Sequence, residues 1–114
     1  MKVLLADDHK MMRDGLRAVL ERDGVEVVGE AQNGREAVAL AHELRPDGLV
    51  MDIGMPGLNG IDATRLLSAE LPKTKVVGLS MHVDRRYVIA MLEAGAVGYL
   101  VKNAASEELL QRCV

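Results

Sequence analysis

Short apolar runs alternate along the chain with longer stretches of helical periodicity. The runs predict five strands, which fall at residues 3–6, 25–31, 48–51, 75–79 and 98–101. A regular alternation of strands and helices is typical of a parallel sheet with helices on both faces. The pattern therefore predicts a single α/β domain over residues 1–114.

The stretches between the runs carry apolar residues at the spacing of amphipathic helices. Gly24 and Gly95 are expected to end the first and fourth helices, Asn33-Gly34 to open the second and Asp84 to cap the fourth. The predicted apolar stripes are Met12, Leu16, Val19 and Leu20, then Ala37, Val38, Ala41 and Leu44, then Ile61, Leu67 and Leu71, and finally Val88, Met91 and Leu92.

Composition narrows the functional classes. The 114 residues are enough for one core, and 49% apolar with 27% charged residues is ordinary for a globular protein. No apolar run approaches the ~20 residues that span a bilayer, so we expect a cytoplasmic chain without membrane contact. A net charge of -3 and only two aromatic residues argue against direct contact with nucleic acid.

Reactive side chains follow four of the five predicted strands. Asp7 and Asp8 follow the first, Asp52 the third, Ser80 the fourth and Lys102 the fifth. Because ligands of open parallel sheets bind outside the carboxyl ends of the strands, these residues form a candidate site.

Three carboxylates at one end of a sheet repel one another and need compensating cations. Lys102 and a divalent metal would supply them, and ligation by oxygen atoms alone suits Mg²⁺. A carboxylate can also be a covalent nucleophile toward a phosphoryl group, given cations to neutralise the phosphoryl oxygens. The residues therefore indicate Mg²⁺-dependent phosphoryl transfer.

Four segments stand out as an ordered set: Ala6-Asp7-Asp8, Met51-Asp52-Ile53-Gly54-Met55-Pro56-Gly57, Gly78-Leu79-Ser80 and Gly98-Tyr99-Leu100-Val101-Lys102. They resemble the motifs of response regulator receiver domains. Two stretches, Leu79-Ser80-Met81-His82 and Gly98-Tyr99-Leu100-Val101-Lys102, are similar to those of the NarL/FixJ subfamily. The resemblance implies a flavodoxin-like, three-layer α/β/α fold whose doubly wound, five-stranded parallel sheet has the order 2-1-3-4-5. That order would bring the four strand ends together.

The resemblance also implies a role for each motif residue. Asp52 would be the phosphoacceptor. Asp8, Asp52 and the backbone carbonyl of Gly54 would bind Mg²⁺ directly, and Asp7 would do so through water. Ser80 and Lys102 would contact the phosphoryl group. Tyr99, with Ser80, would form the conformational switch, in which the ring turns inward when the site is occupied.

The resemblance further implies partners. A sensor histidine kinase would donate the phosphoryl group, and the phosphorylated domain would control an output domain, with homodimer formation as a possible consequence. We expect a last helix from Ser106, cut short at Val114, and a C-terminal helix-turn-helix domain in the parent protein that binds DNA and regulates transcription. The domain itself would undergo phosphorylation and dephosphorylation without conventional enzymatic turnover.

Two alternatives stay open. The first is a phosphatase of the haloacid dehalogenase type, although its D-x-D-x-T signature is missing where Asp7-Asp8-His9-Lys10 stands. The second is an interaction module that is not phosphorylated, since Gly54 and Met81 depart from the pattern of the family. Together with His82, these residues leave the phosphoryl lifetime open. We interpret His9 as a solvated turn residue rather than as a metal ligand.

Overall fold

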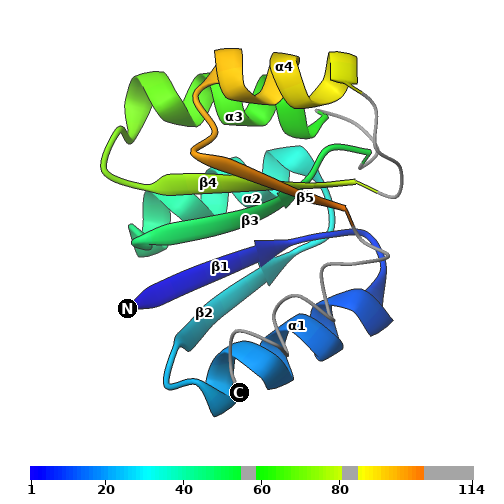
Figure 1. Ribbon diagram of the computed structural model, residues 1–114. Coiled ribbons are helices and arrows are strands. Elements are labelled where there is room, and N and C mark those ends of the chain that lie inside the picture. The colour runs from blue at the N-terminus through cyan, green and yellow to red at the C-terminus, as the bar shows by residue number, and fades with distance from the viewer. Residues whose placement is uncertain (55–58, 81–84, 102–114) are drawn as a thin grey trace.

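The computed structural model describes residues 1–54, 59–80 and 85–101. Its elements, in chain order, are β1 (Lys2–Ala6), α1 (Lys10–Arg22), β2 (Glu26–Ala31), α2 (Gly34–Leu44), β3 (Gly48–Asp52), α3 (Gly60–Glu70), β4 (Lys75–Ser80), α4 (Arg85–Ala94) and β5 (Gly98–Val101). The strands form one parallel sheet of order β2-β1-β3-β4-β5, as predicted (Figure 1). The helix expected from Ser106 lies outside the described residues.

Helices cover both faces of the sheet. α2, α3 and α4 pack on one face and α1 on the other (Figure 1). β1 shows the consequence for the sequence, because Leu4 belongs to the core under α2 and α3 while Val3 and Leu5 belong to the core under α1. Side chains of a strand point alternately to its two faces, so a strand covered on both faces is apolar throughout.

The predicted helix boundaries are confirmed where the structure describes them. The side chain of Asn33 caps α2 by accepting a hydrogen bond from the backbone N–H of Glu36 at 2.8 Å. Gly24 and Gly95 follow α1 and α4 with φ angles of 85° and 116°, a conformation that glycine adopts without steric cost. Asp84, the expected cap of α4, lies outside the described residues.

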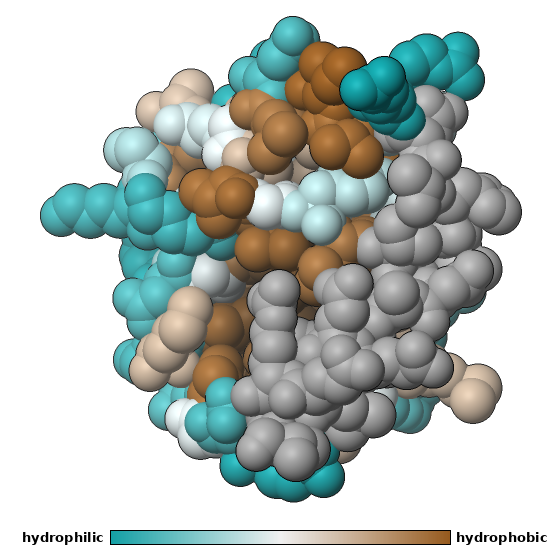
Figure 2. Space-filling model, in the orientation of Figure 1, coloured by the Kyte–Doolittle hydropathy of each residue, from teal (hydrophilic) through white to brown (hydrophobic). Residues whose placement is uncertain are grey.

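Large apolar side chains reach the surface on and beside α4 (Figure 2). Leu92 is 48% exposed, so its assignment to the buried stripe of this helix was wrong, while Met91 is fully buried. The reason is geometric: neighbouring positions on a helix point about 100° apart, and α4 buries a narrow stripe. Across the described part of the chain, no helix combines the length and hydropathy of a membrane span.

Candidate functional site

The register of the sheet aligns the strand ends that carry polar side chains. Ala6 of β1 pairs with Met51 of β3, so Asp7, the residue after β1, comes next to Asp52, the last residue of β3. On the other side of β3, Asp52 pairs with Leu79, the residue before Ser80. We call this end of the sheet, where the strands finish, the carboxyl end.

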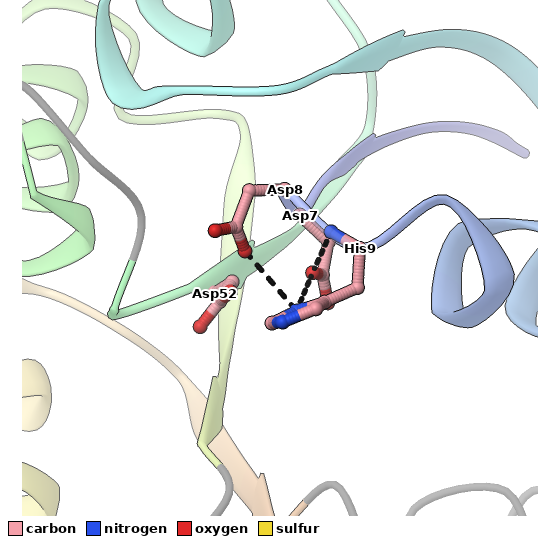
Figure 3. Close-up of side chains that lie close together, drawn as sticks. All are labelled: Asp7, Asp8, His9 and Asp52. Atoms are coloured by element: carbon pink, nitrogen blue, oxygen red, sulfur yellow. Dashed lines mark hydrogen bonds and ion pairs between the residues drawn. The ribbon is translucent and has the colours of Figure 1, made fainter.

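Four side chains gather at the carboxyl end and are here called the acidic cluster: Asp7, Asp8, His9 and Asp52 (Figure 3). Asp7 and Asp52 are buried, with 1% and 4% of their surface exposed. The Asp8 side chain is 33% exposed and the His9 side chain 61% exposed. Two buried carboxylates are thus held beside a third that faces solvent.

His9 bridges two carboxylates of the acidic cluster. Its Nδ1 atom lies 3.0 Å from Oδ1 of Asp7 and 3.1 Å from Oδ1 of Asp8. Its backbone N–H also donates to Oδ1 of Asp7 at 2.8 Å. The interpretation of His9 as a solvated turn residue was therefore incomplete, because the ring is exposed but ion-paired when protonated.

Two glycines shape the surroundings of Asp52. The backbone N–H of Gly54 donates to Oδ1 of Asp52 at 3.0 Å, which orients the carboxylate. At Gly60, a Cβ atom would lie 2.4 Å from the backbone oxygen of Asp52 and 2.6 Å from Cα of Ile53. The start of α3 can approach the end of β3 this closely only because residue 60 has no side chain.

The donor set of the acidic cluster fits a divalent cation. One ligand atom from each of its four residues lies within 4.8 Å of all the others. Octahedral Mg²⁺ binds oxygen at about 2.1 Å, which places its ligands roughly 3 to 4 Å apart. Three carboxylates with this spacing can converge on one Mg²⁺ after small adjustments, and the exposed side of Asp8 leaves access for water ligands.

The remaining predicted residues lie at the same end of the sheet or next to it. Ser80 is buried at the end of β4. β5 ends at Val101, and Lys102 lies outside the described residues. Tyr99 is half-buried and packs near Gly78, where a Cβ atom would come within 3.0 Å of its ring. The Tyr99 hydroxyl oxygen is buried, without a hydrogen-bond partner in the part of the chain that the structure describes.

Sequence reasoning missed Arg13. This residue lies on α1 and is only 7% exposed, and its Nη1 atom donates to the backbone oxygen of Asp7 at 2.6 Å. A signal was present, because Arg13 is three residues before Leu16 on the stripe that faces the sheet. A charged residue on a buried stripe requires a partner, and Arg13 has one within the site.

The chain matches the family described as the response regulator receiver domain over residues 3–114. The chain belongs to the response regulator receiver family. It is 45% identical over 109 residues to the transcriptional regulatory protein LiaR of Bacillus subtilis, covering 95% of this chain and 52% of LiaR. The receiver thus spans about half the length of this curated relative.

Solved structures agree with this assignment. The signal receiver domain of the response regulator NarL from Mycobacterium tuberculosis is 32% identical, with a TM-score of 0.90 and coverage of 97% of this chain and 90% of that one. A chain of the CheX–CheY–BeF3–Mg²⁺ complex from Borrelia burgdorferi is 26% identical, with a TM-score of 0.89 and coverage of 98% and 85%.

The family assignment confirms the resemblance, including its NarL/FixJ-like character. The protein is a receiver domain of a two-component response regulator, and the family implies a histidine kinase as partner. Receivers are signalling domains rather than conventional enzymes, so the phosphatase alternative is not supported. An acidic cluster is typical of this family's cation site.

Proposed function

We propose that Asp52 is the residue of this receiver that accepts the phosphoryl group from a sensor histidine kinase. The observation that carries the proposal is the placement of a buried Asp52 at the end of the central strand β3, with ligand atoms of Asp7 and Asp8 within 4.8 Å. Burying a charged carboxylate beside two others destabilises the fold unless a cation compensates the charge. Such arrangements are typical of functional sites.

We propose Mg²⁺ as the cation. Asp8, Asp52 and the backbone carbonyl of Gly54 would bind it directly, and Asp7 would bind it through water. When bound, Mg²⁺ would neutralise negative charge on the phosphoryl oxygens and so favour attack by a carboxylate. The spacing of the carboxylates supports the assignment. So does the Borrelia burgdorferi relative, whose complex contains BeF3 and Mg²⁺.

In the proposed reaction, a carboxylate oxygen of Asp52 forms a bond to phosphorus while the bond between phosphorus and the donor histidine nitrogen breaks. The electron pair of the broken bond stays on the imidazole, and Asp52 becomes an acyl phosphate. The N–H of Gly54 holds the carboxylate in a fixed orientation before attack. Ser80 and Lys102 would contact the transferred oxygens, one as a hydrogen-bond donor and one as a cation.

The signal would pass from Ser80 to Tyr99. Ser80 donating to the new phosphoryl group would draw the end of β4 toward Asp52 and make room for the Tyr99 ring. Tyr99 pairs with Gly78 of β4, two residues before Ser80, so a movement of this strand end reaches the ring directly. The buried hydroxyl of Tyr99 would gain a partner in the rearranged state.

For the whole protein, we propose that the receiver spans residues 1–114 and controls a C-terminal helix-turn-helix domain that binds DNA, within the cytoplasm. The name of LiaR as a transcriptional regulatory protein and its greater length support this proposal. Phosphorylation would favour a homodimer. The exposed apolar side chains of α4, Ile89 at 50% and Leu92 at 48%, supply surface that such a contact could bury.

Phosphorylation by acetyl phosphate tests the proposal. Intact-mass spectrometry should show one added phosphoryl group on the wild type with Mg²⁺ and none with EDTA. D52N should show none under either condition. D14N provides the matched control, because it removes an exposed carboxylate that pairs with Lys10 on α1 at 3.0 Å, and it should behave like the wild type.

Two results would contradict the proposal. A phosphoryl adduct that survives in D52N would place the reaction elsewhere, and the absence of an adduct in the wild type would favour the unphosphorylated interaction module.

A further inference from the structure

Arg13 connects α1 to the acidic cluster through the backbone rather than through a carboxylate. Its Nη1 atom donates to the backbone oxygen of Asp7 at 2.6 Å, and its Nε atom donates to Oε1 of Glu30 on β2 at 2.9 Å. With 7% of its surface exposed, the guanidinium is desolvated. Desolvation makes both hydrogen bonds necessary for its burial.

Arg17 shares the carboxylate of Glu30 with Arg13. Its Nη1 atom donates to Oε2 of Glu30 at 2.5 Å, so two arginines occupy the two oxygens of one carboxylate. The hydrogen bond to Glu30 is the main cause that raises the pKa of Arg17 above its ordinary value. Arg17 forms no hydrogen bond with the acidic cluster, all four residues of which the structure describes. Its side chain is 38% exposed, and its other partners are Glu21 and the backbone oxygen of Val27.

Arg13 binds the backbone oxygen of Asp7, and this contact holds the backbone from which two carboxylates extend. The carbonyl of Asp7 belongs to the planar peptide group that joins Asp7 to Asp8. The backbone N–H of Asp7 donates to Ala31 of β2 at 3.0 Å, so Asp7 is held by β2 at its nitrogen and by α1 at its oxygen. Fixing this peptide plane fixes the direction in which both carboxylates leave the backbone.

We infer that Arg13 is a positioning residue, which holds the Asp7–Asp8 peptide so that both carboxylates face Asp52. The inference rests on the proposed cation site. For the loss of Arg13, the inference and simple electrostatics predict changes in Mg²⁺ affinity of opposite sign. Removing a positive charge near carboxylates should by itself strengthen Mg²⁺ binding, whereas losing the orientation of the ligands should weaken it.

Calorimetric titration with Mg²⁺, at fixed pH and ionic strength, separates the two effects. R13M keeps much of the buried stem but removes both donors, and its Mg²⁺ affinity should fall about 10-fold or more, the usual effect of losing a group that orients metal ligands. R17M removes one positive charge that also pairs with Glu30, but it leaves the contact between Arg13 and Asp7 in place. The Mg²⁺ affinity of R17M should therefore match that of the wild type or exceed it.

R13K keeps the positive charge and replaces R13M in the titration if R13M does not fold. Circular dichroism would show whether each variant is folded. A single ammonium group cannot reproduce the forked contact with Asp7 and Glu30, so Mg²⁺ affinity should lie between those of the wild type and R13M. A second readout needs no metal. The backbone N–H of His9, which donates to Asp7, should exchange with solvent faster in both Arg13 variants.

The outcomes are distinguishable. Mg²⁺ binding by the wild type together with equal or tighter binding by the folded Arg13 variants would overturn the inference and leave the proposed function intact. Equal weakening in R17M and R13M would also overturn it, because the effect would then come from the ion-pair network as a whole. Failure of the wild type to bind Mg²⁺ would contradict the proposed function itself.

Discussion

At the amino end of the sheet, polar groups meet complementary partners, whereas at the carboxyl end three carboxylates face one another. Thr74 donates to the backbone oxygen of Pro46 at 2.8 Å, and Oδ2 of Asp47 accepts from the backbone N–H of Lys2 at 2.7 Å. Asp7 and Asp52 also accept hydrogen bonds, from the backbone N–H groups of His9 and Gly54, but they share the acidic cluster with a third carboxylate.

The difference indicates two uses for the two ends of one sheet. Hydrogen bonds to neutral backbone groups tie the strand starts together and contribute to stability. Buried carboxylates that repel one another lower stability until a cation binds, and such local conflicts are typical of functional sites. Substitutions at the two ends should therefore change stability and cation binding independently.

The largest expected effect on stability comes from Gly60, which lets α3 approach the acidic cluster. In G60A the new Cβ atom would collide with the backbone of Asp52 and Ile53, which cannot rotate away. We expect the free energy of unfolding in urea to fall by about 3 kcal/mol, at the upper end of the usual cost of overpacking.

G15A is the matched control, because Gly15 lies on α1 at a position with room for a side chain. Nothing lies within 4 Å of a Cβ atom at Gly15, so this variant should be up to about 1 kcal/mol more stable than the wild type. Equal stability of G60A and the wild type would show that α3 does not need this close approach.

A smaller effect is expected at the amino end. T74V removes the buried hydroxyl that donates to Pro46 and leaves that carbonyl oxygen without this donor. The free energy of unfolding should fall by about 1 to 2 kcal/mol, while Mg²⁺ affinity stays at the wild-type value. A loss of Mg²⁺ affinity in folded T74V would mean that the two ends are not independent.

The smallest expected effect is a gain in stability, at Asp52. D52N keeps the oxygen that accepts from Gly54 but removes one of three crowded charges. In EDTA its free energy of unfolding should exceed that of the wild type by about 1 kcal/mol, and D14N should change stability by less than about 0.5 kcal/mol. If D52N proves less stable than the wild type, mutual repulsion does not dominate the acidic cluster.

The five strands and the ends of α1 and α4 could be predicted because strands and helices have different periods along the chain. The order of the strands also agrees with the prediction, but it came from the family resemblance and not from the periodicity. The carboxyl-terminal limits of two strands differ from the prediction by one residue. β3 and β4 extend one residue further than predicted, through Asp52 and Ser80, because a polar residue interrupts an apolar run without ending the hydrogen-bonded ladder.

The site was predictable to the level of its carboxylates and no further. Asp7, Asp8 and Asp52 follow apolar strands, and strand order brings them together. The burial of Arg13 follows from its place on the stripe of α1 that faces the sheet, but its partner could not be assigned from spacing, and neither could that of His9. Both partners depend on how α1 sits against the sheet and on the path of the turn after β1, which the periodicity of the sequence does not specify.

The central claim is that Asp52 itself carries the phosphoryl group. Borohydride reduces an acyl phosphate of aspartate to homoserine, which marks the modified position permanently. After phosphorylation with Mg²⁺ and reduction, peptide mass mapping should find homoserine at position 52 and aspartate at positions 7 and 8. Homoserine at position 7 or 8, or unaltered aspartate at all three positions of a phosphorylated sample, would contradict the account.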